Sequence, residues 1–223
     1  FILLLVSLVY QNRFTIRPDL FSLLFFSLYV WILSFHLDKK WSLFALFLIQ
    51  VLWTNIHGFF FFGPLFVLIG LTAEWVKRHV PLPYEWNKIG RLTDDEYERL
   101  VWILVTVLLA CLLNPLTFRG AWYPVGVFFK LSQGHQIFFD RIVELKRPLT
   151  ADTLWSADSY PYYKLLIVMS FISMVFNRRR LDIGVVAFWL IFLAFSMAAI
   201  RNLIFFAFAA YLVFVTNILT VSL

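Results

Sequence analysis

Long apolar runs alternate with short polar interruptions along nearly the whole chain. A helix crosses the hydrocarbon core of a bilayer in about 20 residues, within a range of about 17–25. Apolar runs of this length are typical of membrane-spanning helices. The pattern therefore predicts an all-α fold, a polytopic transmembrane helical bundle of about eight membrane segments. These segments are 1–10, 20–36, 41–55, 59–76, 100–114, 161–177, 183–200 and 203–223.

Both ends of the chain lie inside apolar runs. The chain begins at Phe1, without an initiator Met, and ends at Leu223. We therefore expect residues 1–223 to be a transmembrane domain that is a fragment of a longer chain, with a truncated first segment. Residues 55–58, Asn-Ile-His-Gly, interrupt the apolar stretch 41–76, and Asn and Gly tolerate turn geometry. This interruption predicts a tight helical hairpin.

The connection 115–160 is too long to be only a link between two helices. Its first part, 121–131, is rich in aromatic residues, which favour the headgroup region of a membrane. These residues are Trp122, Tyr123, Phe128 and Phe129. Its second part is polar and charged. We therefore expect 115–160 to be an outer loop with an interfacial helix.

Composition supports a membrane protein and excludes other classes. Hydrophobic residues make up 62% of the chain and charged residues 14%, whereas soluble domains are about a quarter charged. The net charge of +6 is not arranged as a basic stripe with interleaved aromatics outside the apolar runs, so no nucleic-acid partner is predicted. The single cysteine, Cys111, excludes an internal disulfide.

Basic residues concentrate in three interruptions, at 38–40, 77–99 and 177–180. Loops rich in Lys and Arg stay in the cytoplasm. When these three loops are placed there, successive connections alternate between the two sides of the membrane through every predicted span. We therefore expect an integral protein of a bacterial inner membrane, with its other polar motifs facing outside. Those motifs contain basic residues against the sidedness rule, which indicates an anionic ligand at the outer membrane interface.

Six side chains in the outer motifs are candidates for binding a phosphate group. Arginine offers a bidentate fork that stays charged, and histidine can donate or accept a proton near neutral pH. The candidates are Arg13, Arg17, Asn55, His57, Arg201 and Asn202. Simpler alternatives stay open, because arginine side chains also extend to lipid headgroups and polar residues also cap helices or form turns.

Four further residues are candidates for an acceptor site or a secondary site. Three of them, Asp19, Asp140 and Glu144, have carboxylates, which can act on or bind a hydroxyl group. The fourth is the cationic Arg119. Motifs for nucleotide, zinc or simple hydrolase chemistry are absent from the sequence. No cofactor and no metal site are therefore predicted, and a requirement for a divalent metal is left open. Nothing in the sequence indicates an oligomeric state.

Four short motifs follow one another in a definite order along most of the chain. They are Arg13-x-x-x-Arg17-Pro-Asp19, Trp53-x-Asn55-x-His57-Gly58, Asn114-Pro115 and Arg201-Asn202. This order resembles that of bacterial polytopic membrane glycosyltransferases of the GT-C class. These are relatives of the dolichyl-phosphate-mannose protein mannosyltransferases and of the lipid A aminoarabinose transferase.

The resemblance implies an enzyme that takes a sugar from a polyprenyl-phosphate carrier and passes it to an acceptor on the outer face of the inner membrane. It implies that the cationic and amide candidates meet at one periplasmic pocket and hold the donor phosphate. It also implies an acidic base in the first outer loop, which we expect upstream of Phe1, so the catalytic residue is unassigned. The expected partners are a polyprenyl-phosphate-linked sugar and membrane lipids.

Two other functions would use the same residues. A transporter or flippase for lipid-linked glycans would bind the phosphate without breaking a bond. A scaffold for envelope assembly would use the polar motifs only to end helices. The glycosyltransferase is the preferred hypothesis.

Overall fold

The computed structural model describes residues 1–11, 17–132 and 142–220. Within these residues it contains ten α-helices, short 3-10 helices and no strand. The predicted all-α class is therefore confirmed. Two of the candidate residues, Arg13 and Asp140, lie outside the described residues. The chain divides into two compact units, unit 1 and unit 2, and each is considered by itself.

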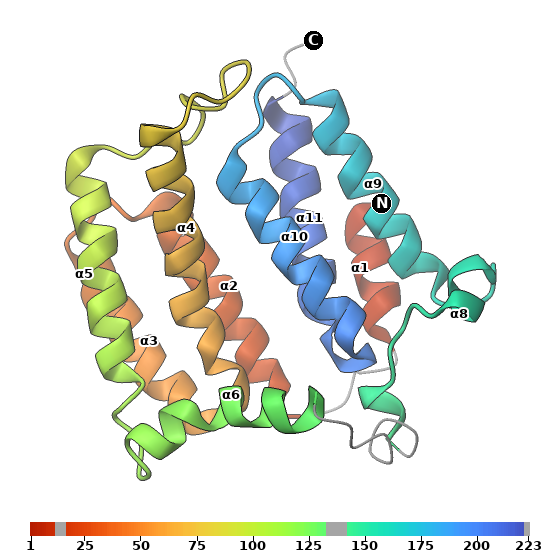
Figure 1. Ribbon diagram of the computed structural model, residues 1–223, viewed down its shortest axis with the longest axis horizontal. Helices are drawn as coiled ribbons and strands as arrows, with labels where there is room; N and C mark the ends of the chain where they lie inside the picture. Colours follow the sequence, from red (N-terminus) through yellow and green to blue (C-terminus); the bar gives the residue numbers. More distant parts are fainter. Residues whose placement is uncertain (12–16, 133–141, 221–223) are drawn as a thin grey trace. The chain divides into compact units, whose positions relative to one another are not determined.

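Unit 2 consists of Ile16–His79 and Arg91–His135. Four of its helices pack against one another, and a further helix, α6, lies across one end of them (Figure 1). The connections from α2 to α3 and from α3 to α4 are short, so these three helices alternate in direction. The elements are α2 (Asp19–Phe35), α3 (Trp41–Ile56), the 3-10 helix η2 (Gly58–Phe61), α4 (Phe62–His79), α5 (Asp94–Ala110) and α6 (Phe118–Ser132).

Helix α5 differs from its predicted range of 100–114 at both ends. It begins earlier because Thr93 and Glu96 form a capping box, in which the Glu96 carboxylate accepts from the Thr93 backbone N–H at 2.8 Å. It ends earlier, at Ala110, and the Asn114 side chain then donates to the Cys111 carbonyl at 2.8 Å. Polar residues at each end thus set bounds that hydrophobicity alone misplaces.

Helix α6 covers the segment for which an interfacial helix is predicted, and it is longer than the expected 121–131. It lies across the ends of the neighbouring helices of unit 2 rather than alongside them (Figure 1). Phe118 and Trp122 stack on each other with ring centroids 6.1 Å apart, and both are exposed, as are Tyr123 and Phe129. An amphipathic helix with exposed aromatic rings has the form expected of a headgroup-region helix.

A buried polar network joins the helices of unit 2 close to η2. Gln50 of α3 is fully buried, accepts from the Tyr29 hydroxyl at 2.6 Å and donates to the Phe60 carbonyl at 3.0 Å. Gly63 permits this approach, because a Cβ atom there would overlap Gln50 Oε1 and lie 2.9 Å from Tyr29. The network fixes η2, which directly follows His57, against α2 and α3.

Unit 1 consists of Phe1–Thr15, Val80–Gly90 and Gln136–Leu223. Its four longer helices lie alongside one another (Figure 1). Those helices are α1 (Ile2–Tyr10), α9 (Pro161–Phe176), α10 (Ile183–Ala198) and α11 (Leu203–Thr220). Its shorter elements are η3 (Val143–Leu145), α8 (Ala151–Trp155) and η4 (Ile200–Asn202).

Hydrogen bonds between buried side chains also tie the helices of unit 1 together. The Tyr163 hydroxyl of α9 lies 2.6 Å from Ser196 Oγ of α10. The Asn177 amide, which follows α9, donates to Asn217 Oδ1 of α11 at 2.9 Å. Such bonds between helices are typical of proteins in which a polar side chain has no water to bind.

Large apolar side chains face outward from the helices of both units. On α5 the exposed residues are Val101, Trp102, Val105, Leu108 and Leu109. On α9 they include Val168, Phe171, Ile172 and Val175. Both sets repeat at helical spacing, so each forms a continuous apolar stripe on one side of its helix.

By length and composition, two helices in the described part of the chain could cross a membrane. They are Gly58–His79, with 22 residues, and Ile200–Thr220, with 21 residues. Length alone does not separate these from buried helices of a soluble protein. Four further apolar helices are shorter, namely α2, α3, α9 and α10. At 1.5 Å per residue they extend about 25 Å, slightly less than a typical hydrocarbon core.

Candidate functional site

His57 lies where α3 ends and the chain turns into η2. Its backbone is extended, with φ −152° and ψ 143°, and its N–H still donates to the Trp53 carbonyl at 3.1 Å. The extended conformation ends α3 and directs the chain into η2. The predicted hairpin break at 55–58 is therefore where the structure turns, and His57 is its central residue.

The Ser22 hydroxyl links Trp53 to His57. Trp53 can only donate, and its Nε1–H donates to Ser22 Oγ at 2.9 Å. Ser22 is fully buried, and its Oγ lies 2.7 Å from His57 Nδ1. When Ser22 donates this hydrogen bond, the ring proton of neutral His57 is on Nε2. This tautomer suits the ring to donate a hydrogen bond to an anion.

Arg17 and Asp19 lie at the start of α2, and both are partly buried. The Leu20 N–H donates to the Arg17 carbonyl at 3.1 Å, so the backbone of Arg17 belongs to the helix start. Asp19 and Ser22 are three residues apart and share one face of α2. Asp19 is therefore one helical turn from the contact between Ser22 and His57. The start of α2 and the end of α3 thus bring Arg17, Asp19 and His57 to one end of unit 2.

Asn55 already uses its amide group within the fold. Its Nδ2 donates to the Val51 carbonyl and to the Leu113 carbonyl, both at 2.8 Å. These bonds connect the last turn of α3 to the end of α5. Both amide protons are therefore engaged, and only the Asn55 oxygen is left to contact a ligand. Its role as a phosphate donor stays a prediction that would require a rearrangement.

Arg201 and Asn202 lie in unit 1, in the 3-10 turn that leads into α11. Asn202 is buried, and its amide donates to the Phe195 carbonyl at 2.9 Å. The Ile200 N–H donates to the Lys146 carbonyl at 2.9 Å, so η4 packs on η3. Unit 1 therefore brings Glu144, which lies in η3, to the same region as Arg201.

The remaining described candidate, Arg119, is exposed on the first turn of α6 in unit 2. Among the described residues, no group of three or more His, Cys, Asp or Glu could hold a metal ion. The sequence patterns did not identify Ser22, and they included Trp53 in the motif Trp53-x-Asn55-x-His57-Gly58 without a role in binding. Ser22 is an ordinary small residue inside an apolar run, and its only signal is its spacing of one turn from Asp19.

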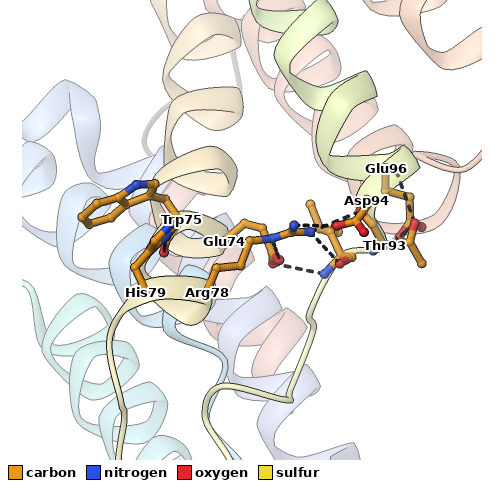
Figure 2. Close-up of polar contacts among 8 residues, drawn as sticks. Glu74, Trp75, Arg78, His79, Thr93, Asp94 and Glu96 are labelled. Atoms are coloured by element: carbon orange, nitrogen blue, oxygen red, sulfur yellow. Dashed lines mark hydrogen bonds and ion pairs between the residues drawn. The ribbon is translucent and has the colours of Figure 1, made fainter.

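Figure 2 shows a charged cluster near the other end of α4. Glu74 is 1% exposed, and its carboxylate accepts from Arg78 Nε at 2.7 Å and from the Leu92 N–H at 3.1 Å. Arg78 also binds the exposed Asp94 at 2.6 Å and lies 4.6 Å from the ring centroid of Tyr97. The cluster joins the end of α4 to the start of α5. Its sequence signal was the spacing of four residues between Glu74 and Arg78.

The two ends of unit 2 therefore differ in chemistry. The end that holds Arg17 and His57 carries few charges and is crossed by α6. The other end contains the basic turn 38–40 and the basic residues of 77–79. Arginine and histidine side chains can both donate hydrogen bonds to an anionic oxygen.

Comparisons of the chain with protein-family models, with curated proteins and with solved structures found no match. Function therefore has to be argued from the geometry of unit 2 and from the order of the motifs.

Proposed function

We propose that this chain is a membrane protein that transfers a sugar from a polyprenyl-phosphate carrier to an acceptor. The transfer takes place at the outer face of a bacterial inner membrane. The observation that carries the proposal is the contact between His57 and Ser22 of α2, at the end of unit 2 where Arg17 precedes that helix. The type of reaction is proposed from the order of the motifs, which resembles that of GT-C glycosyltransferases.

The membrane setting is supported by the distribution of polar and apolar side chains. Gln50, Ser170 and Asn217 are buried between helices, while large apolar residues line the outer faces of α5 and α9. An exposed apolar surface of this extent is unfavourable in water and favourable in lipid. We therefore assign the long helices of both units as membrane segments, about eight in all. Helix α6 lies in the headgroup region.

The proposed reaction breaks the bond between the sugar C1 atom and the phosphate oxygen of the carrier. The carrier phosphate keeps the electron pair of that bond and gains negative charge. Arg17 and the Nε2–H of His57 stabilise this charge in a site with little water, where fixed donors act strongly. A bond forms between C1 and the acceptor oxygen or nitrogen. The acceptor proton leaves to a general base, to which we assign no residue.

The test supplies the purified protein, in lipid nanodiscs, with polyprenyl phosphate carrying radiolabelled mannose or aminoarabinose, together with a bacterial cell-envelope extract as the source of acceptor. We expect one of these donors to lose its label with time and to leave free polyprenyl phosphate. A transporter would bind the donor without cleaving it, and a scaffold would not bind it. Tight binding without any release of carrier phosphate would therefore contradict the transferase and favour transport.

A further inference from the structure

The turn between α2 and α3 contains a cluster of aromatic rings, the Trp31–Trp41 cluster, formed by Trp31, His36 and Trp41. The His36 ring contacts both indoles, with centroid distances of 4.4 Å to Trp31 and 5.2 Å to Trp41. The indoles are 6.3 Å apart and are 46% and 45% exposed. Half-exposed tryptophans of this kind are typical of the boundary between lipid tails and headgroups.

Three cationic side chains belong to the same turn or bind to it. Lys39 and Lys40 belong to the turn itself, and both are exposed. Arg99 comes from α5 and donates to the Leu37 carbonyl at 3.1 Å, which brings its guanidinium to the same turn. The local acid is Asp38, which binds Lys39 at 2.7 Å, and this bond lowers the pKa of the Asp38 carboxyl group. Among the described residues, Lys40 and Arg99 have no acidic partner.

We propose that the α2–α3 turn of unit 2 binds the headgroup of an anionic phospholipid. Lys39, Lys40 and Arg99 contact its phosphate, and Trp31 and Trp41 pack against its glycerol and upper acyl region. The excess of cations matches the charge of the headgroup. A soluble anion would use the cations alone, whereas the exposed rings beside them match a ligand that is charged at one end and apolar at the other. This site lies at the end of unit 2 opposite to Arg17 and His57.

The inference rests on the membrane insertion proposed above, but not on the transferase activity. In the proposed orientation the turn faces the cytoplasmic leaflet, where anionic lipids attract basic segments. The lipid site is therefore distinct from the proposed site for the polyprenyl-phosphate donor, and each can be tested without the other.

The test measures binding of phosphatidylglycerol and of phosphatidylcholine to the detergent-purified protein by native mass spectrometry. We expect the Lys39→Gln/Lys40→Gln variant to bind phosphatidylglycerol about tenfold to thirtyfold more weakly, because each cation near a headgroup contributes about a fivefold gain in affinity. The matched control, Arg178→Gln/Arg179→Gln, removes the same charge from another exposed turn and is expected to change binding less than twofold. Trp31→Leu/Trp41→Leu is expected to weaken both lipids.

Equal loss of phosphatidylglycerol in the two double-charge variants would overturn the proposal, because it would show attraction to basic residues in general. Competition by inorganic phosphate at concentrations equal to the lipid would overturn it too, because it would show a site for a soluble anion. A protein that binds phosphatidylglycerol in this manner but releases no carrier phosphate would refute the transferase and leave the lipid site standing.

Discussion

Arg17→Ala is expected to slow the release of carrier phosphate by about a hundredfold or more. This is the usual cost of removing one fixed group that stabilises charge in the transition state. The Arg17 backbone carbonyl, which accepts from Leu20 at 3.1 Å, is kept in this variant. The start of α2 should therefore form as before, and the loss should reside in the chemical step. Release of radiolabelled sugar from the donor, followed at saturating donor, measures it.

Two matched variants decide whether the effect is specific to this position. Arg17→Lys keeps the charge but loses the bidentate fork, so we expect an intermediate rate. Arg91→Ala removes an exposed cation from outside the proposed site and is expected to leave the rate unchanged. If Arg17→Ala and Arg91→Ala release carrier phosphate equally fast, the assignment of Arg17 to the phosphate is wrong.

Glu74→Gln is expected to lower the free energy of unfolding by about 3 kcal/mol, near the lower end of the cost of breaking a buried ion pair. Glu74 is 1% exposed and accepts from both Arg78 and the Leu92 N–H. The loss stays near the lower end because Arg78 is 21% exposed and keeps its bond to Asp94 (Figure 2). Loss of helical circular dichroism in mixed micelles with rising SDS content measures the change.

Asp94→Asn is the control for this prediction, because it removes the other acid bound to the same arginine. Asp94 is 92% exposed, and exposed ion pairs contribute less than about 1 kcal/mol. Equal losses of stability in the two variants would show that the buried Glu74 contributes no more to the charged cluster between α4 and α5 than the exposed Asp94 does. That result would contradict the prediction.

The helices of this chain could be predicted from sequence because each apolar run is long and ends at residues with a clear local preference. The break at 55–58 is an example, where His57 adopts an extended backbone and stops α3. The early start of α5 was missed because the predicted range followed hydrophobicity. The capping box of Thr93 and Glu96 instead begins the helix among charged residues.

The candidate site was harder to predict because its contacts join distant parts of the chain. Nothing in the apolar run of α2 marks Ser22 as the partner of His57, 35 residues away. Asn55 illustrates the opposite case. Its amide is a donor group that could bind a phosphate, but it already donates to two backbone carbonyls. Residue type indicated the chemistry, and only packing showed which donors are already used.

The account depends most on the opposite sidedness of the two ends of unit 2. Single cysteines placed at Arg119 and at Lys40, both exposed, can be tested in intact cells with a membrane-impermeant maleimide. The native Cys111 is buried and should contribute little background. We predict that position 119 reacts from outside and that position 40 reacts only after the membrane is permeabilised. Reaction of both positions from outside, or of position 40 alone, would contradict the account.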